Sequence, residues 1–392
     1  MPNLGDVTHG PWRALAERRE AKMAESVHAF LRGNTAAFYD WLSGRRLPKG
    51  PPIWIGGDLH VGNIGPVAAA DEEVALQIRD LDQTVIGNPT HDVLRLGFSL
   101  ATVALASGLD GTVMLDMLGA IAHGYAHGVA RRRGGERPKP VRFVMKKAHR
   151  RSWPDLLDER DVEHASLPRS RKFMRLTRGA RAAIERIVEK DHTGELVTML
   201  GCRDDDATVR LLDAAFWVKG CSSLGLVRIA ALVAVSGSSK KKGGLALLDF
   251  KEARPSCAPT TRHPAQAEAE RVVLGARALA PNLGERMLAT HVLGRSVFVR
   301  ELLPQDLKLE LEDIARSEAA NVAAYVARVV GLAHGHQMDE PTRREWLRAL
   351  QSKKSATFPA WLGAEVSRLL ALQARAYLEH CATIRGTHLA RR

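Results

Sequence analysis

The chain has 392 residues and a mass of 42.9 kDa, which is enough for a large two-lobed enzyme or for two domains. Hydrophobic residues make up 45% of it and charged residues 26%, which excludes a fibrous, collagen-like or largely disordered protein. The net charge is +13, and residues 131–190 alone carry 19 basic and 8 acidic residues. Because this block matches no nucleic-acid-binding motif, we expect an arginine-rich solvated face and no nucleic-acid partner.

Neither a membrane span nor a secretory leader is predicted. The longest uncharged apolar run, residues 96–109, contains two glycines and is too short to cross a bilayer. Residues 1–19 contain no apolar stretch followed by a small-residue cleavage site, so we expect a cytoplasmic protein. The cysteines lack CxxC spacing and are expected to be reduced thiols: Cys202, Cys221, Cys257 and Cys381.

The first part of the chain is predicted to be mainly helical with two short strands. Apolar residues at helical spacing predict two helices in residues 11–43. Residues 53–55 and 73–78 are predicted strands, and acidic residues follow both. Residues 92–131 predict two apolar helices, and residues 131–213 predict a basic helical insert that glycines and prolines interrupt.

From residue 216 the pattern changes to that of a small sheet with one helix. Strands are predicted at residues 226–235, 245–250 and 297–302, with a turn at 237–244 and a helix at 263–280. Beyond Pro304 the pattern is helical again, in residues 314–334, 342–350 and 360–384.

The sharpest motif is the loop Gly57-Asp58-Leu59-His60-Val61-Gly62-Asn63, which Asp80-Leu81-Asp82 follows. Phosphoryl transfer from a nucleotide needs one carboxylate that orients the attacking hydroxyl, and an amide oxygen with a second carboxylate that hold Mg²⁺ against the phosphates. Protein-kinase-like folds use this order of side chains, and the loop resembles that of aminoglycoside and choline kinases.

We predict that Asp58 and His60 are catalytic residues, with Asp58 as the base. The predicted ligands of Mg²⁺ or Mn²⁺ are Asn63, Asp80 and Asp82. The alternative is an ordinary turn after a strand, in which Asp58 accepts backbone hydrogen bonds.

A nucleotide kinase also needs a glycine-rich hairpin, a strand lysine and a helix glutamate, and here these follow the loop instead of preceding it. Residues 219–225 form the hairpin, where glycines allow backbone N–H groups to approach phosphate oxygens. Lys251 would contact the phosphates and pair with a glutamate of the next helix. The predicted ATP-binding set is Gly220, Ser222, Ser223, Gly225, Lys251, Glu268 or Glu270, and the hinge residues Glu301 and Leu302.

The sequence resembles a widespread bacterial family of unknown function that is grouped with the protein-kinase-like folds and has its lobes in permuted order. The matching segments are residues 30–33, 57–65, 80–82, 92–96, 223–225, 251–253, 270–273, 299–302 and 332–334. The chain departs from the family pattern at Ser222, where a second glycine is usual. Helical projection favours Glu268 as the partner of Lys251, whereas the family pattern marks Glu270.

Asp92, His123 and His127 are further candidates for a role at the site. In kinase-like folds an Asp early on the helix after the metal loop binds the backbone of the catalytic loop, and Asp92 stands at the matching position. The simpler interpretation is that the helix dipole favours a carboxylate at this N-terminus. His123 and His127 are four residues apart and could share a metal, but without a nearby carboxylate we expect partly buried core histidines.

Two other functions remain open. The series Gly57-Asp58-Leu59-His60, Asp80, Asp82, Asn88, His91 resembles binuclear metallophosphoesterases, but only five residues separate Asp82 from Asn88, too few for a crossover between strands. The second is a pseudokinase or nucleotide-binding module that does not transfer phosphate.

The sequence thus predicts an α+β, two-lobed, protein-kinase-like fold with circular permutation, in which a mainly helical larger lobe accompanies a small antiparallel-sheet lobe. Its predicted parts are residues 1–130, with the catalytic loop and metal site; 131–215, a basic helical insert; 216–303, the nucleotide-binding lobe; and 304–392, the C-terminal helices. The predicted activity is transfer of phosphate from ATP, with Mg²⁺ or Mn²⁺, to a hydroxyl of an unidentified acceptor, most simply a small molecule.

Overall fold

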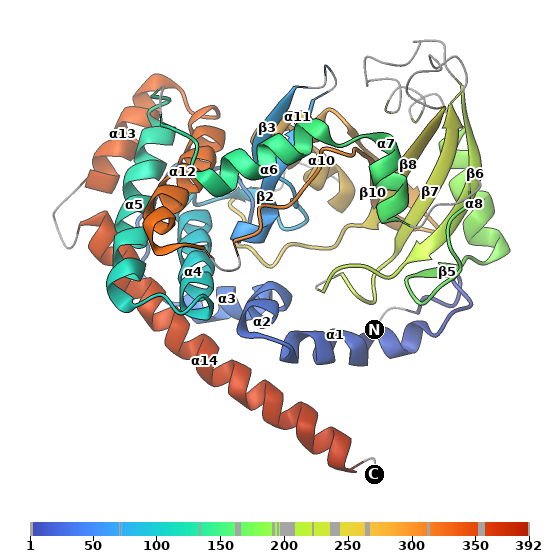
Figure 1. Cartoon of the computed structure of the whole chain (residues 1–392), viewed down its shortest axis with the longest axis horizontal. Helices are drawn as coiled ribbons and strands as arrows, with labels where there is room; N and C mark the ends of the chain where they lie inside the picture. Colours follow the sequence, from blue (N-terminus) through green and yellow to red (C-terminus); the bar gives the residue numbers. More distant parts are fainter. Residues whose placement is uncertain are drawn as a thin grey trace.

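The structure is a computed structural model that describes residues 3–69, 71, 73–132, 135–160, 166–189, 193, 196, 208–221, 223–235, 244–262, 267–311, 314–351 and 357–390. It is an α+β structure in which a six-stranded antiparallel sheet, here the sheet lobe, stands beside a mainly helical part, here the helical lobe (Figure 1). None of the helices in the described residues combines the length and the apolar character that crossing a bilayer requires.

The sheet lobe has the strand order β5-β6-β7-β8-β10-β9, and each neighbouring pair is antiparallel. Its strands are β5 (Phe173–Arg175), β6 (Val209–Trp217), β7 (Arg228–Val235), β8 (Leu245–Glu252), β9 (Met287–Val292) and β10 (Arg295–Leu302). Successive side chains point to opposite faces, so both faces acquire an apolar surface. Ile229 packs on the face that α8 (Arg178–Val188) covers, whereas Leu232 packs with Leu156 of α7 (Trp153–Glu159) on the other face.

The helical lobe is built around α4, which is buried on almost every side. Its helices are α2 (Val27–Gly33), α3 (Thr35–Leu42), α4 (Thr90–Ala106), α5 (Gly111–Val129), α12 (Arg316–Gly335), α13 (Glu340–Gln351) and α14 (Phe358–Ala390). Helices α5 and α12 pack at very short range through glycines. A Cβ on Gly128 would lie 2.2 Å from the carbonyl oxygen of Arg328, so no larger residue fits there.

Two small two-stranded antiparallel sheets hold the predicted site. Strand β1 (Ile53–Ile55) pairs with β4 (Val85–Gly87), and β2 (Ile64–Ala68) pairs with β3 (Val74–Ile78). The catalytic loop, residues 57–63, connects β1 to β2 and ends in a short 3₁₀ turn, η2 (Val61–Asn63). Residues 80–82 lie in the connection from β3 to β4, so both predicted motifs lie at the open end of the β2–β3 hairpin.

Helices from distant parts of the chain join the two lobes. Helix α10 (Glu268–Leu279), which α11 (Pro281–Gly284) follows, contacts β9, β10 and β1. The side chain of Arg271 donates to the carbonyl oxygens of Asp82 and Thr84, which ties α10 to the loop after β3.

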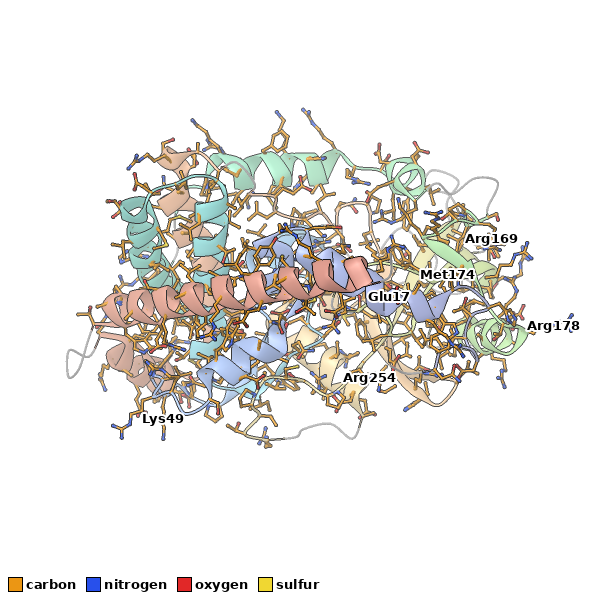
Figure 2. All side chains as sticks on the ribbon, turned by 90° about the horizontal axis from the view of Figure 1, so that it is seen from below. Glu17, Lys49, Arg169, Met174, Arg178 and Arg254 are labelled. Atoms are coloured by element: carbon orange, nitrogen blue, oxygen red, sulfur yellow. The ribbon has the colours of Figure 1, made fainter. Side chains whose placement is uncertain are left out.

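The N-terminal helix α1 (Leu15–Ala24), which follows the turn η1 (Trp12–Ala14), lies along the lower side of both lobes (Figure 1). Helix α14 runs beside it, as Figure 2 shows near Glu17. Tyr377 of α14 donates to the carbonyl oxygen of Ala24 at 2.9 Å. The first and the last α-helix of the described chain therefore pack against each other.

Several predicted elements are confirmed: the strands at 53–55 and 73–78, the helices in 92–131, the three strands after residue 226, and the three C-terminal helices. Of the predicted helix at 263–280, residues 268–279 are helical, while residues 263–266 and 236–243 lie outside the described residues. Cys221, Cys257 and Cys381 are free thiols, as predicted, and Cys202 lies outside the described residues.

The prediction that residues 131–213 form an interrupted helical insert is wrong in part, because the segment also contains strands. Helix α6 (Lys139–Arg150) packs on the β2–β3 hairpin, but β5 and the first residues of β6 belong to the sheet. Charged side chains on the solvent side of β6, such as Arg210, hide its alternating pattern. Strands β2 and β9 were not predicted either, because the Gly65-Pro66 pair and His291 interrupt their apolar residues.

Candidate active site

The catalytic loop is anchored by Asp92 in the first turn of α4. This carboxylate is fully buried, and its two oxygens accept hydrogen bonds from the backbone N–H groups of Gly56 (2.7 Å) and Gly57 (2.9 Å). Gly57 has a φ of +74°, and a Cβ there would lie 2.1 Å from the carbonyl oxygen of Gln83, so the turn requires glycine. The predicted contact of Asp92 with the loop backbone is confirmed.

A buried chain of hydrogen bonds extends this anchor through three helices. His334 donates from Nε2 to Asp92 (3.2 Å), its Nδ1 accepts from the hydroxyl of Tyr125 (2.9 Å), and Trp346 donates to that hydroxyl (3.2 Å). With the ring proton of His334 on Nε2, each donor in this series of hydrogen bonds has one acceptor. No site role is predicted from the sequence for Tyr125, His334 or Trp346, because buried aromatic residues and a buried histidine are typical of an ordinary core.

Asp58 is held by an arginine inside the helical lobe. Arg95 of α4 approaches Asp58 Oδ1 through Nε at 2.8 Å and through Nη2 at 2.7 Å. This guanidinium is 1% exposed, donates also to the carbonyl oxygen of Leu31, and lies over the ring of Phe38. Asp58 is 13% exposed, so solvent reaches part of its side chain. The signal that could have revealed Arg95 is its charge in an otherwise apolar helix, where it shares the first turns of α4 with Asp92.

His60 is buried behind the loop. Burial lowers its pKa well below the usual value, and the charges of Arg32 and Arg95 act in the same direction. Its ring is therefore uncharged at neutral pH, and its Nδ1 has no hydrogen-bond partner in the described part of the chain. The ring lies edge-on to that of His28, with the centroids 6.4 Å apart.

Asn63 is oriented by the loop itself. Its Nδ2 donates to the carbonyl oxygen of Asp58 at 2.9 Å, which leaves the side-chain oxygen as the atom available to a cation. The residue is buried, so this orientation is fixed by its surroundings.

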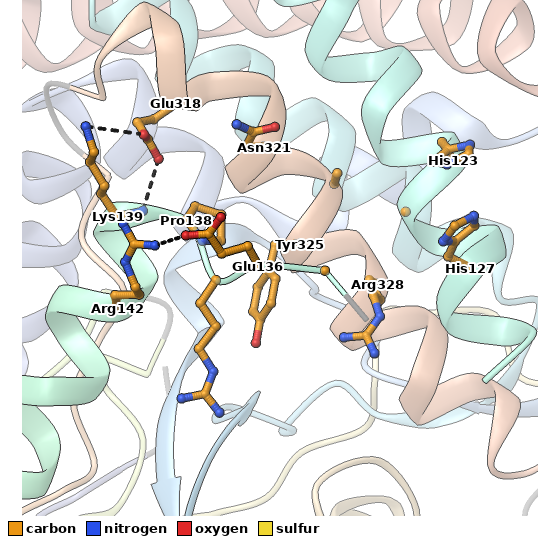
Figure 3. A pocket seen from close by; sticks show the side chains of 14 residues that line it. His123, His127, Glu136, Pro138, Lys139, Arg142, Glu318, Asn321, Tyr325 and Arg328 are labelled. Atoms are coloured by element: carbon orange, nitrogen blue, oxygen red, sulfur yellow. Dashed lines mark hydrogen bonds and ion pairs between the residues drawn. The ribbon is translucent and has the colours of Figure 1, made fainter. Parts of the chain in front are cut away.

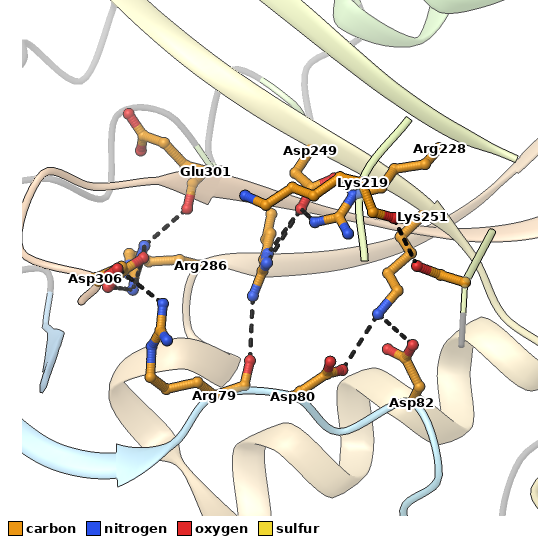
Figure 4. Close-up of polar contacts among 12 residues, drawn as sticks. Arg79, Asp80, Asp82, Lys219, Arg228, Asp249, Lys251, Arg286, Glu301 and Asp306 are labelled. Carbon is orange, nitrogen blue, oxygen red and sulfur yellow. Dashed lines mark hydrogen bonds and ion pairs between the residues drawn. The ribbon is translucent and has the colours of Figure 1, made fainter. Parts of the chain in front are cut away.

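Lys251 of β8 meets both carboxylates of the loop after β3 (Figure 4). Its ammonium lies 3.2 Å from Asp80 Oδ1 and also forms an ion pair with Asp82. These residues are about 170 positions apart in the sequence, so the fold itself brings them together. The lysine is almost fully buried, whereas 45% of the Asp80 side chain and 24% of the Asp82 side chain remain exposed.

The pKa values of the two carboxyls are shifted in opposite directions. Protein atoms surround the pair, although solvent reaches Asp80 from one side, and this burial would raise both pKa values. For Asp80 the charge of Lys251, the hydrogen bond with Asp82 and the charge of Arg300 outweigh burial and lower the pKa. For Asp82, burial and the neighbouring charge of Asp80 raise the pKa to about 6. Burial would lower the pKa of Lys251, but the two aspartates raise it.

This pair fits a divalent cation that has further ligands. Asp82 Oδ1 is buried and has no hydrogen-bond partner in the described part of the chain. Among the described residues no group of three or more His, Cys, Asp or Glu side chains could hold a metal. Mg²⁺ commonly binds to one or two carboxylates and completes its shell with water and phosphate oxygens, so two carboxylates and an amide suffice for it.

The predicted pairing of Lys251 with a helix glutamate is replaced by these aspartates. In the described residues the ion pair of Glu268 is with Arg271, one turn along α10 (2.7 Å). Glu270 accepts a hydrogen bond from the backbone N–H of Ala267 at the start of the helix. Both glutamates stand in the first turn of α10, where the helix dipole and the capping interaction favour a carboxylate.

The glycine hairpin, residues 219–225, connects β6 to β7. Gly220 and Gly225 have φ values of +91° and +94°, so both use the backbone region that favours glycine. Ser223 Oγ donates to the carbonyl oxygen of Lys219 (3.0 Å), and Lys22 of α1 donates to that of Gly220 (2.9 Å). Ser222 lies outside the described residues.

The predicted hinge is less open than an ATP site requires. The carbonyl oxygen of Glu301 accepts a hydrogen bond from Arg286 (2.8 Å), as Figure 4 shows, and Glu301 pairs with Leu248 of β8. Leu302 lines a hollow of about 40 Å³ together with Lys219 and Leu156. Ligand sites commonly measure about 300–1,000 Å³, so a purine needs more room than this hollow offers.

An ion cluster that was not predicted from the sequence lies on the face of the sheet that carries Lys251. Asp249 is fully buried and pairs with Arg228 (2.6 Å) and Arg300 (3.1 Å). Burial would raise the pKa of Asp249, but the two guanidinium groups outweigh it and lower the pKa. Lys219 lies beside this cluster over the ring of Trp217, and burial lowers its pKa well below the usual value.

His123 and His127 line a separate pocket of about 630 Å³ between α5, α12 and the start of α6 (Figure 3). Their ring centroids are 4.3 Å apart. His123 is exposed and His127 half-buried, so the prediction of partly buried core histidines is wrong for His123. Glu318 faces the same pocket but binds Lys139.

Asn88 and His91, which the metallophosphoesterase alternative needs as metal ligands, have other contacts. Asn88 uses its side chain to accept from the backbone N–H of Gly50 and to donate to the carbonyl oxygen of Pro48. His91 lies against the ring of Tyr39. These contacts give both residues structural roles.

A family model described as "Uncharacterized protein conserved in bacteria (DUF2252)" matches residues 12–383. Comparison with curated proteins gives no match, and comparison with solved structures gives none either. The match covers both lobes, the catalytic loop and Lys251. The chain therefore belongs to the bacterial DUF2252 family.

Proposed function

We propose that this protein is a Mg²⁺-dependent phosphotransferase of the kinase type, which transfers the γ-phosphoryl group of ATP to a hydroxyl of a small-molecule acceptor. The observation that carries the proposal is the contact of Lys251 with Asp80 and Asp82. Kinases need a strand lysine and a metal-binding carboxylate on opposite walls of one cleft, and these residues come from the sheet lobe and from the β3–β4 connection.

The order of elements in the sheet lobe supports this proposal. In protein kinases the glycine-rich loop precedes the lysine, and the lysine lies on the third strand. Here the glycine hairpin connects β6 to β7, Lys251 lies on β8, and α10 follows. The same elements follow the catalytic loop in the chain, so the proposed fold is a kinase-like fold with its lobes in permuted order.

Each predicted residue has a chemical task in this proposal. Asp80, Asp82 and Asn63 would hold Mg²⁺, which would neutralise charge on the phosphates. Lys251 would then contact phosphate oxygens. Asp58 would accept the proton of the acceptor hydroxyl while that oxygen bonds to phosphorus and the bond from phosphorus to the ADP oxygen breaks.

The base of the nucleotide needs space that α7 now fills. Leu156 of α7 packs with Leu302 and Leu247 on the face of the sheet next to the hinge. Nucleotide binding therefore requires α7 to move away from the sheet, or the base to lie outside the usual position.

A second candidate function is a nucleotide-binding module without transfer. The ion pair between Asp58 and Arg95 favours it, because Asp58 already has a buried partner inside the fold and so has a structural role without any transfer. Formation of ADP and of a phosphorylated product separates the two functions.

Isothermal titration calorimetry with ATP tests the proposal, with Mg²⁺ and with EDTA, on the wild type and on Lys251→Met. We expect Mg²⁺-dependent binding that weakens at least about tenfold in Lys251→Met, since an ion pair to phosphate is lost. Lys146→Met on the exposed face of α6 is the matched control. If the wild type binds no nucleotide under either condition, the proposal fails.

A further inference from the structure

Three cations from separate segments converge between the catalytic loop and the glycine hairpin. We call Lys22, Arg32 and Lys308 the cationic cluster. Arg32 Nε lies 3.9 Å from the position of a Cβ on Gly62. Lys22 donates to the carbonyl oxygen of Gly220.

Lys308 reaches the same place from the segment after β10. Its neighbour Leu309 donates a backbone hydrogen bond to the carbonyl oxygen of Ile64, directly after the catalytic loop (3.1 Å). The carbonyl oxygen of Leu307 lies 2.2 Å from the position of a Cβ on Gly65, so the two segments run in close contact. The fold thus fixes Lys308 beside the loop.

The cationic cluster differs in its partners from three other cations of the cleft. Arg95, Arg228 and Lys251 each pair with an aspartate. In the described part of the chain, by contrast, the three cluster side chains form no ion pair. Arg32 Nε, with Nδ1 of both His28 and His60, is buried and has no hydrogen-bond partner there.

The pKa values of His28 and Lys308 are both lowered in part by the positive charges around them. Burial lowers the pKa of His28 to about 4, and Arg32 and Lys308 contribute in the same direction. Burial and the charges of Arg32 and Arg79 lower the pKa of Lys308, although Asp80 opposes this. Buried polar atoms usually have a hydrogen-bond partner, so Arg32 Nε and the two imidazole nitrogens are the atoms of this region that have hydrogen-bonding capacity to offer a ligand.

We propose that the acceptor carries an anionic group of its own, a carboxylate or a phosphate, and that Arg32 and Lys308 bind it with His28 as a hydrogen-bond partner. This inference rests on the proposed phosphotransferase function. An arginine binds either oxyanion through two N–H groups, and a hydroxyl on the same acceptor would then point to Asp58 on the catalytic loop. The phosphates of the nucleotide are the other possible source of such an anion, but Lys251 and the glycine hairpin already provide for them.

Calorimetric titration with inorganic phosphate tests the site in the full-length protein. We expect one bound phosphate per chain, with affinity reduced at least about tenfold in Arg32→Gln and in Lys308→Gln. Lys146→Gln, an exposed cation of α6, should bind like the wild type. Equal affinity in wild type and Arg32→Gln would mean an adventitious ion only and would overturn the proposal.

A second titration in saturating Mg-ADP identifies the source of the anion. If phosphate still binds with Mg-ADP present, the cationic cluster serves the acceptor. If Mg-ADP displaces phosphate, the cluster holds the nucleotide and the proposal is overturned. If Mg-ADP itself does not bind, the phosphotransferase function fails, and phosphate binding that depends on Arg32 still supports the anion site.

Arg32→Gln could act by disturbing α2, so folding is checked by thermal unfolding. The proton resonances of the His28 ring provide a second readout. Bound phosphate should raise the pKa of His28 in the wild type and leave it unchanged in Lys308→Gln. A His28 pKa that phosphate does not move in the wild type would also overturn the proposal.

Discussion

The carboxylate of Asp58 and the guanidinium of Arg95 form an ion pair at the boundary between the catalytic loop and the core of the helical lobe. Only 1% of Arg95 is exposed, and its other contacts are the carbonyl oxygen of Leu31 and the ring of Phe38. A buried guanidinium that loses its anionic partner is costly, so Asp58 serves the fold as well as the proposed chemistry.

Asp58→Asn tests both roles. We expect turnover to fall by about 10²–10⁴-fold, the usual contribution of a positioned base. We also expect unfolding free energy to fall by about 1–3 kcal/mol, because an amide oxygen is a weaker acceptor for Arg95 than a carboxylate. Urea denaturation and ADP formation per folded molecule measure the two effects.

Asp40→Asn is the control, since Asp40 is an exposed carboxylate of α3. It should change neither quantity. Turnover of Asp58→Asn at the wild-type rate would assign the chemistry to other residues and would favour the nucleotide-binding module.

The sequence predicted the residues of the cleft better than their partners. The orientation of Asn63 is local, because its amide donates to Asp58 of the same loop. The contact of Asp92 with the loop backbone spans more than 30 residues, and it was predicted from the resemblance to kinase-like folds. The partners of Lys251 and Asp58 come from elements far away in the sequence. One charged residue on an apolar helix, such as Arg95, does not say which loop it will meet.

The same reason explains which parts of the fold were missed. Strand β6 carries Arg210 and Asp213, whose side chains serve surface and ion-pair contacts, so its alternation is weak. The cover that α7 forms over the sheet depends on packing of Leu156 against strands that follow it. Periodicity identifies an apolar face, but it does not identify what covers that face.

Asp80→Ala should abolish Mg²⁺-dependent binding of ATP. The substitution removes the more exposed of the two carboxylates that meet Lys251, and a hard cation loses its charged oxygen ligand. Calorimetry with Mg-ATP measures the effect. Asp116→Ala, which removes an exposed carboxylate of α5, should bind like the wild type. Unchanged Mg-ATP affinity in Asp80→Ala would exclude Asp80 as a metal ligand.

Mg²⁺ binding should depend on the proton of Asp82. Burial and the charge of Asp80 raise its pKa from 3.8 to about 6, so the folded protein keeps a proton that a cation must displace. The apparent affinity for Mg²⁺ in the presence of ADP should rise about tenfold per pH unit between pH 5 and 6 and level off above. Calorimetry across pH 5–8 measures this slope.

Protonation of Asp82 weakens Mg²⁺ binding, but it increases the free energy of unfolding. Between about pH 4 and pH 6 the folded state binds a proton that the unfolded chain has lost, so the contribution of Asp82 to the unfolding free energy decreases as pH rises. Asp82→Asn removes the titrating group and should flatten both dependences. A pH dependence of Mg²⁺ binding that persists in Asp82→Asn would locate the proton elsewhere.

Gly128→Ala should destabilise the helical lobe by more than about 2 kcal/mol. The new Cβ would lie 2.2 Å from the carbonyl oxygen of Arg328, so α5 and α12 would have to separate. Gly119→Ala on the same helix is the matched control, because nothing lies within 4 Å of its Cβ position. It should stabilise the protein by about 0.4–1 kcal/mol through the unfolded chain. Similar midpoints of urea denaturation for the two variants would contradict the close packing.

Leu156→Ala should increase the affinity for Mg-ATP. Leu156 is 3% exposed and packs with Leu247 and Leu302, so its truncation weakens the contact of α7 with the sheet by about 2–5 kcal/mol. When a binding-competent state is rarely populated, the apparent affinity is reduced by its population. If α7 must leave the sheet before the nucleotide can enter, the variant needs less free energy to move α7. We therefore expect its binding of Mg-ATP in calorimetry to be at least about tenfold tighter. Phe143→Ala, which truncates a side chain of α6 that is 71% exposed, should bind like the wild type. Equal affinity in Leu156→Ala, with its thermal midpoint lowered, would show that α7 is a fixed part of the core and that the base binds elsewhere.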